Sequence, residues 1–116
     1  MYYQITDISS KVAVIPSTLE VPSGDTARFF CTVKQSEPKA VIRWRKQGES
    51  GFITTEGRFT LTPDGALQIR DTIFEDQGDL YECTAQNPLT ATTYTSVNAG
   101  SLEITDGKFF LILKHE

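Results

Sequence analysis

The chain has 116 residues, of which 39% are hydrophobic and 22% are charged, and its 11 basic and 15 acidic side chains give a formal net charge of −4. This length suits one globular domain, and the composition excludes a disordered chain. The mild acidity argues against a nucleic acid partner, and no apolar run approaches the length of about 20 residues that direct membrane insertion requires.

The first residues are expected to lead into a strand that changes sheets. Residues 1–10 are mostly polar and are interpreted as a lead-in or an inter-domain linker. The β-branched stretch 11–16 ends at Pro16, which cannot donate to a strand ladder. We therefore expect this strand to break at Pro16 and to continue over residues 18–21 on a second sheet. Residues 26–34 alternate between apolar and polar side chains, which predicts a half-buried strand.

The middle of the chain predicts a strand followed by a long connection. Residues 40–46 form the strand, with Trp44 on its inward face and Arg43 and Arg45 on its outward face. Residues 47–57 contain three glycines and few apolar side chains, which indicates a connection with at most one short edge strand.

Turn residues divide the second half of the chain into further strands. Asp64-Gly65 between two alternating stretches is typical of a hairpin. The expected elements are a hairpin of residues 58–62 and 66–70, a corner over 72–78, and strands over 80–87 and 92–104, the last of them bent near residues 98–100. The chain shows no long helical pattern and no internal repeat, so the expected fold class is all-β.

A spacing of cysteine, tryptophan and tyrosine links these strands to a known family. Cys31 and Cys83 bracket the only tryptophan, Trp44, and Tyr81 stands two residues before Cys83. The pattern resembles the immunoglobulin superfamily, and within it the I-set, over residues 11–104. The resemblance implies a two-sheet antiparallel β-sandwich with a Greek key, in which the two cysteines join the sheets, Trp44 packs on the disulfide and Tyr81 fixes the corner.

Further positions match the same family. They are Gly24, Arg45, Leu67, Ile69, Asp76, Gly78 and Asn87. Residues 11–105 are accordingly interpreted as the I-set domain, and residues 106–116 as a hydrophobic C-terminal extension. The family usually has one residue between the glycine and the tyrosine, but two separate Gly78 from Tyr81. This insertion favours a bulge at the corner and weakens the expectation of an ion pair between Asp76 and Arg58.

The extension contains an apolar stretch behind a second Asp-Gly dipeptide. Its members are Phe109, Phe110, Leu111, Ile112 and Leu113, flanked by Lys108 and Lys114. The stretch is predicted to be an extra strand that pairs within the chain or with a second copy, and the alternative is the start of another domain. The flanking lysines favour a strand that is meant to be paired.

No catalytic residue, cofactor or metal is expected. The only histidine, His115, is next to last in the chain, and Cys31 is expected to be a buried strand cysteine. Glu75 and Asp76 are expected on a solvated corner, where a carboxylate is a poor general acid. Two distant cysteines with one terminal histidine do not form a zinc set, and Asp76 and Asp79 lack the spacing of a calcium loop.

Binding residues are expected on one strand and in one loop. The candidates are Arg43, Arg45 and Lys46 on the strand, and Asn87 and Leu89 in the loop 87–91. With Lys34 and Lys39, the strand residues make one basic cluster. The cluster would suit an acidic protein surface or a sulfated glycosaminoglycan, and the alternative is cross-strand pairing with Glu82. The loop would present Leu89 as an apolar tip, and the alternative is a plain turn.

The resemblance implies a non-enzymatic recognition or adhesion module of a larger extracellular or cell-surface protein, in cell adhesion or a receptor ectodomain. The expected partner is a protein, with self-association as one form of that contact. Two strand cysteines suit an oxidising compartment, and the absence of a signal-peptide pattern suggests a longer parent. The alternatives are an intracellular filament module that acts as a mechanical spacer, and a matrix module that binds glycosaminoglycan through the basic cluster.

Overall fold

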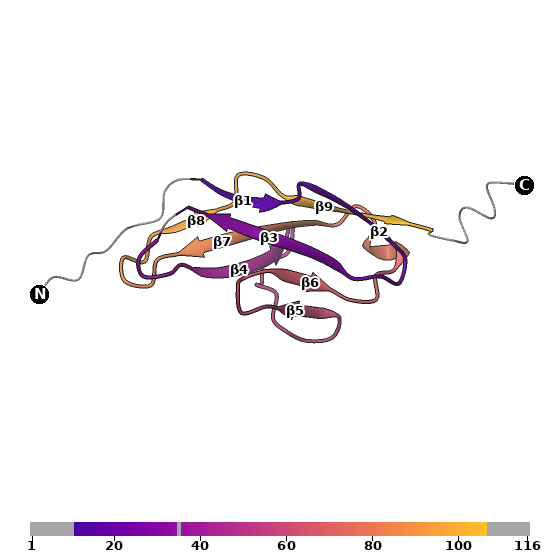
Figure 1. Ribbon diagram of the computed structural model, residues 1–116, viewed down its shortest axis with the longest axis horizontal. Coiled ribbons are helices and arrows are strands. Elements are labelled where there is room, and N and C mark those ends of the chain that lie inside the picture. The colour runs from indigo at the N-terminus through magenta and orange to yellow at the C-terminus, as the bar shows by residue number, and fades with distance from the viewer. Residues whose placement is uncertain (1–10, 35, 107–116) are drawn as a thin grey trace, which may run out of the picture.

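Two sheets face each other in the computed structural model, which describes residues 11–34 and 36–106 (Figure 1). The first sheet has the order β1-β3-β6-β5, and its strands are β1 (Val12–Ile15), β3 (Ala27–Val33), β5 (Phe59–Leu61) and β6 (Leu67–Ile69). The second sheet has the order β2-β9-β7-β4, and β8 also pairs with β7. Its strands are β2 (Thr18–Pro22), β4 (Val41–Lys46), β7 (Leu80–Gln86), β8 (Thr93–Thr95) and β9 (Gly100–Thr105). The predicted two-sheet sandwich is confirmed.

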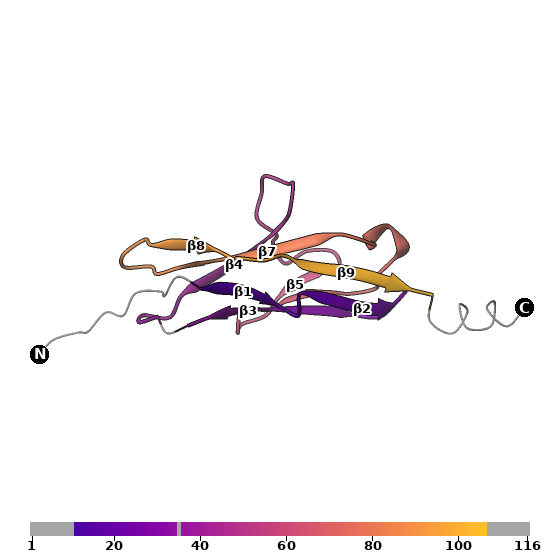
Figure 2. The same cartoon turned by 90° about the horizontal axis from the view of Figure 1, so that it is seen from above.

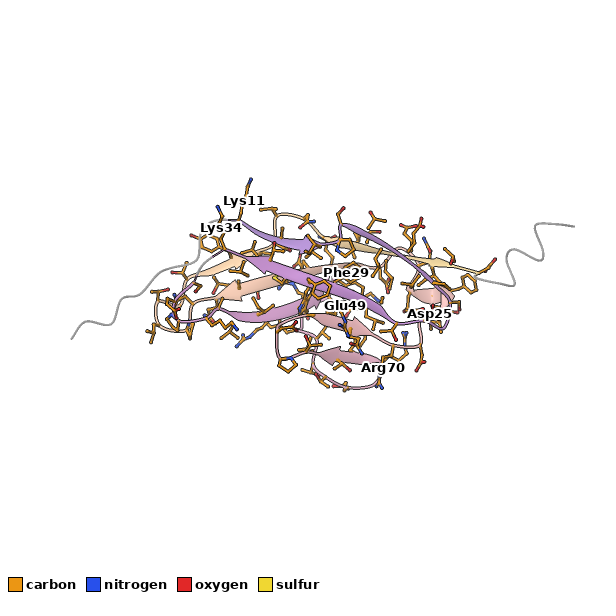
Figure 3. The ribbon with its side chains drawn as sticks, viewed as in Figure 1. Lys11, Asp25, Phe29, Lys34, Glu49 and Arg70 are labelled. Atoms are coloured by element: carbon orange, nitrogen blue, oxygen red, sulfur yellow. A yellow bond between two sulfur atoms is a disulfide. The ribbon has the colours of Figure 1, made fainter. Side chains whose placement is uncertain are left out.

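The core lies between the two layers, which are separated in the view from above (Figure 2). Residues along β3 alternate, so that Phe29 is fully buried while Phe30 is exposed, and Phe29 lies in the middle of the sandwich (Figure 3). Cys31 and Cys83 form the predicted disulfide between the sheets, and Trp44 is buried opposite Cys83 in the β4–β7 register. Burying each large apolar side chain contributes about 1.5–3 kcal/mol.

The polar atom of the central tryptophan is satisfied by a turn. Nε1 of Trp44 donates to the carbonyl of Gly65 at 2.7 Å. Gly65 has a φ of 90°, which favours glycine, and a Cβ there would meet the side chain of Ile42 at 3.0 Å. The predicted Asp64-Gly65 turn therefore both joins β5 to β6 and provides the hydrogen-bond acceptor for the core tryptophan.

The first strand changes sheets at Pro16, as predicted. β1 pairs antiparallel with β3 in the first sheet, whereas β2 pairs parallel with β9 in the second. A proline at the transition costs no ladder hydrogen bond, because both ladders are interrupted there. The switch leaves the two sheets joined along one side by a continuous backbone.

The corner before β7 contains the predicted bulge. Gly78 and Asp79 both face Leu102: the N–H of Gly78 donates to the carbonyl of Leu102 at 2.8 Å, and the N–H of Leu102 donates to the carbonyl of Asp79 at 2.9 Å. Gly78 has a φ of 81°, as the first residue of such a bulge requires. The bulge absorbs the extra residue, so Tyr81 remains buried.

The expectation that the inserted residue disfavours an ion pair between Asp76 and Arg58 was wrong. The short 3₁₀ helix η1 (Phe74–Asp76) presents Asp76 to Arg58 just before β5, and the two side chains form a bidentate pair. Because the bulge takes up the insertion after Asp76, the position of the carboxylate relative to the first sheet is not disturbed.

The last predicted strand is divided in two. β8 and β9 are separated by residues 96–99, where the side chain of Asn98 contacts β1. The predicted connection over residues 47–57 contains no strand and only an isolated bridge between Glu56 and Phe59. The lead-in 1–10 and the extra strand predicted over Phe109–Leu113 lie outside the described residues.

Candidate functional site

The outward face of β4 carries two arginines that share one aromatic ring. Cζ of Arg43 lies 5.4 Å from the ring centroid of Phe52, and Cζ of Arg45 lies 5.5 Å from it. We call these three residues the arginine–phenylalanine surface. Alternation along β4 points both arginines outward while Trp44 between them enters the core.

The loop after β4 brings Phe52 to this position. The N–H of Ile53 donates to the carbonyl of Trp44 at 2.8 Å, and the N–H of Glu49 donates to the carbonyl of Lys46 at 3.0 Å. These bonds fold the loop back along β4, so that Phe52 lies across the arginines and remains 44% exposed. Each exposed cation–π contact contributes about 0.5–1 kcal/mol.

Cross-strand ion pairs border this surface. Arg45 faces Glu82 in the β4–β7 register, and its Nε donates to Oε2 of Glu82 at 2.7 Å. Nζ of Lys46 lies 3.2 Å from a carboxylate oxygen of Asp79. The cross-strand interpretation of the basic cluster is thus confirmed for Arg45. Among the described residues, Arg43 has no carboxylate within ion-pair distance.

A groove of about 520 Å³ opens beside Phe52. Its lining combines charged side chains of both signs with apolar ones: Lys46, Glu49, Glu56 and Arg58 with Phe52, Ile53 and Phe59. Exposed arginine and aromatic side chains on a rigid sheet are the residue types that dominate protein–protein contacts. The surface can therefore bind a partner that offers a carboxylate or an apolar group.

The loop between β7 and β8 separates its two candidate residues. Leu89 is 58% exposed, whereas Asn87 is fully buried. Oδ1 of Asn87 accepts the N–H groups of Leu89 at 2.9 Å and Thr90 at 3.4 Å. Asn87 therefore shapes the loop and presents no exposed surface to a partner, which corrects its interpretation as a binding residue, while Leu89 remains available.

The corner residues form the most strongly perturbed electrostatic group. Nη1 and Nη2 of Arg58 donate to the two carboxylate oxygens of Asp76 at 2.9 and 3.0 Å, and Oδ2 also accepts the N–H of Ile73 at 2.9 Å. Hydrogen bonding to Arg58 holds the pKa of the Asp76 carboxyl below its ordinary value, and the same contact raises the pKa of Arg58. Burial raises the pKa of the Tyr81 hydroxyl, and the carboxylate of Asp79 adds to this effect. This group stabilises the corner: Asp76 and Tyr81 are buried, and only Arg58 reaches the wall of the groove beside Phe52.

Other classes of site have no support in the described part of the chain. Both cysteines are joined in the disulfide, so neither thiol is available as a nucleophile. Residues 11–34 and 36–106 contain no group of three or more histidine, cysteine or acidic side chains that could hold a metal ion. In the same ranges, no helix is long and apolar enough to cross a membrane.

The sequence did not identify Phe52 as part of the site. It lies in a connection whose glycines predict only irregular structure, and no periodicity relates it to β4. The available signal was an Arg-x-Arg pair on an outward face, followed by an aromatic residue in the next loop. That signal does not show which way the loop folds.

Comparisons with known proteins agree on one family. The model of the immunoglobulin I-set domain matches residues 10–98. Brother of CDO from Homo sapiens is 33% identical over 90 residues, which are 78% of this chain and 8% of that protein. Probable oxidoreductase PXDNL from Homo sapiens is 37% identical over 79 residues, or 68% of this chain and 5% of that protein.

A solved structure agrees with this result. The N-terminal eight Ig domains of Down Syndrome Cell Adhesion Molecule match with a TM-score of 0.68 and 26% identity, over 82% of this chain and 13% of that chain. The present chain spans less than a tenth of both curated relatives. Activities of those whole proteins, an oxidoreductase included, are therefore not transferred with the match.

Proposed function

Since the chain belongs to the immunoglobulin I-set family, we propose that it is a non-enzymatic protein-recognition module of a larger extracellular or cell-surface protein, in adhesion or in a receptor ectodomain. The likeness to a cell adhesion molecule supports this role. The bond between Cys31 and Cys83 supports an oxidising compartment. An intracellular filament module would instead keep both cysteines reduced, and counting free thiols in protein from a reducing host and from an oxidising host distinguishes the two.

The observation that carries the proposal is the arginine–phenylalanine surface. Arg43 is exposed and faces no carboxylate among the described residues, and Phe52 is exposed and held in place by two guanidinium groups. A partner that offers a carboxylate to Arg43 and an apolar group to Phe52 would gain both contacts without reordering the sheet. Rigid presentation of this kind reduces the entropy lost on binding.

Glycosaminoglycan binding receives less support at the same place. Two of the three basic side chains on β4, Arg45 and Lys46, already face Glu82 and Asp79. A sulfated chain would have to displace these carboxylates or accept their repulsion. A protein partner can instead address Arg43 and Phe52 and leave the ion pairs in place.

Binding of the labelled, tetramerised chain to a panel of cells tests the proposal. We expect binding that disappears when surface proteins are removed by protease, that persists after heparinase, and that is lost in Arg43→Glu and Phe52→Ser. Lys39→Ala, an exposed substitution outside the surface, is the matched control and should bind normally. Protease-resistant, heparinase-sensitive binding would instead identify a polysaccharide ligand, and binding that survives both substitutions would reject this surface.

We also propose that two copies of the chain associate with each other. The apolar segment Phe109–Leu113 is the element we propose for contact between copies, because an unpaired apolar strand tends to add to another sheet edge. Its test is a comparison of the association states of the chain with and without the segment.

A further inference from the structure

The outward face of the first sheet is positively charged. We call Lys11, Ile15, Arg28, Phe30, Lys34 and Arg70 the basic face. All six side chains are exposed, and β1, β3, β5 and β6 contain no aspartate or glutamate. Lys11 and Lys34 lie side by side at one end of the sheet, as the β1–β3 register requires, and Arg70 lies toward the other end (Figure 3). A face without acidic strand residues is unexpected in a chain with a net charge of −4.

The charges of this face are not balanced within the described part of the chain. Arg28 donates to Oε1 of Gln68 at 2.6 Å, and Arg70 donates to the carbonyl of Gly57 at 2.8 Å, so both acceptors are neutral. Across residues 11–34 and 36–106, carboxylates come within ion-pair distance only of Arg45, Lys46 and Arg58. The basic face therefore contains no ion pair among the described residues, in contrast to Arg45 and Lys46 on β4.

An apolar pair occupies the centre of the same face. Ile15 and Phe30 are cross-strand partners in the β1–β3 register, and they are 48% and 39% exposed. Arg28 and Lys34 stand on either side of Phe30 along β3 and are about 20 Å apart at the rise of a strand. An apolar centre with a charged rim is the usual arrangement of a protein–protein interface.

The basic face lies along the side of the described part of the molecule. β1 begins and β9 ends at opposite ends of the long axis, and the first sheet lies along the side between them (Figure 1). Asp25, Asp64 and Asp71 are exposed residues of turns and bends between the strands, and of these three carboxylates that of Asp64 interacts with the charge of Arg28.

We propose that the basic face is a second docking surface, for a protein that presents acidic side chains around an apolar centre. The charge pattern selects an acidic partner, and the Ile15–Phe30 pair selects a protein over a sulfated polysaccharide, which would leave that apolar pair without an apolar contact. The basic face lies on the first sheet, whereas Arg43 lies on β4 of the second sheet. It is therefore a separate contact from the arginine–phenylalanine surface. It rests on the proposed function only in that the chain acts by recognition.

Nuclear magnetic resonance titration of the ¹⁵N-labelled full chain tests this surface with synthetic peptides. The first peptide has glutamates on both sides of a Leu-Phe centre, the second keeps the glutamates around a serine centre, and the third keeps Leu-Phe between lysines. We expect only the first to shift the amide signals of β1 and β3, with an affinity that falls as salt is raised. Arg28→Glu combined with Lys34→Glu should weaken binding about tenfold or more, because attraction becomes repulsion.

Two matched variants separate this surface from the one on β4. Phe30→Ser should weaken binding of the first peptide. The amide signals of the variant away from position 30 should match those of the wild type, since Phe30 is outside the core. Arg43→Glu should leave that binding unchanged. Loss of binding in Arg43→Glu, or no shift of β1 and β3 amides with any peptide, would overturn the proposal. Stronger shifts of the same amides by a heparin oligosaccharide would also overturn it, in favour of a polysaccharide site. The cell-binding result for Phe52→Ser tests the arginine–phenylalanine surface and does not depend on the peptide titrations, so either proposal can fail alone.

Discussion

Asp76 is a buried carboxylate that depends on one arginine. Its side chain is 8% exposed and that of Arg58 is 33% exposed. We expect Asp76→Asn to lower the free energy of unfolding at pH 7 by about 2 kcal/mol. This value lies between those for exposed and for buried ion pairs, because Asp76 is shielded from water and Arg58 is partly exposed. Urea unfolding measures the difference. Glu75→Gln removes an exposed neighbouring charge and should have little effect.

The same substitution predicts a pH dependence with a definite sign. The pKa of Asp76 is lower in the folded chain than in the unfolded chain, mainly because Arg58 hydrogen-bonds to the charged form. The stabilisation is therefore complete above the unfolded pKa of about 3.9 and is lost as pH falls through the folded value. The stability difference between wild type and Asp76→Asn should shrink as the solution is acidified. A difference that stays constant down to pH 2 would show that the carboxylate charge does not contribute.

Gly100 is a position where packing permits only glycine. A Cβ would lie 2.6 Å from two ring carbons of Phe29 and 2.8 Å from Cγ1 of Val14. Because both neighbours are buried in the core, Gly100→Ala should lower the free energy of unfolding by about 1–3 kcal/mol. Gly51→Ala, where a Cβ meets nothing within 4 Å, is the control and should be nearly neutral. Equal stability of the two variants in urea would refute the close packing at Gly100.

At the scale of elements, Asn98 replaces a missing strand pairing. Its Oδ1 accepts the N–H of Val14 at 2.8 Å, and its Nδ2 donates to the carbonyl of Val14 at 2.9 Å. The amide thus connects the outer edge of β1 to the break between β8 and β9. Asn98→Ala should cost about 1–3 kcal/mol, because both backbone groups of the buried Val14 lose their partner.

Hydrogen exchange at Val14 locates this effect within the fold. We expect the Val14 amide to exchange faster in Asn98→Ala than the global loss of stability explains, since the opening concerns β1 alone. Val97→Ala truncates a side chain that is 69% exposed and should leave the exchange rate unchanged. Unchanged protection of Val14 in Asn98→Ala would mean that the contact does not hold β1.

At the scale of the molecule, the sequence predicted the sandwich because its strongest signals are residues with one structural role. The resemblance to the I-set implies that Trp44 packs on a bond between the two cysteines, and the structure contains that bond with Trp44 buried opposite Cys83. The two-residue gap before Tyr81 predicted the bulge but not the ion pair, since the pair depends on how the bulge absorbs the insertion. Phe52 could not be placed on Arg43, because loop direction depends on backbone hydrogen bonds that no periodic pattern encodes.

Self-association is the remaining property of the whole molecule, and we propose that it depends on Phe109–Leu113. Residues 106–107 are an Asp-Gly pair that favours a hairpin, and the apolar segment after it would be a liability if left exposed. Sedimentation velocity of the full chain beside a chain that ends at Thr105, which retains all of β9, measures the association state. We expect a dimer for the full chain and a monomer for the shorter one. Leu111→Lys keeps the length but interrupts the apolar segment, and it should also give a monomer. If the full chain and the truncated chain are both monomers of equal stability, strand addition between copies is wrong, and adhesion would have to proceed through a different protein.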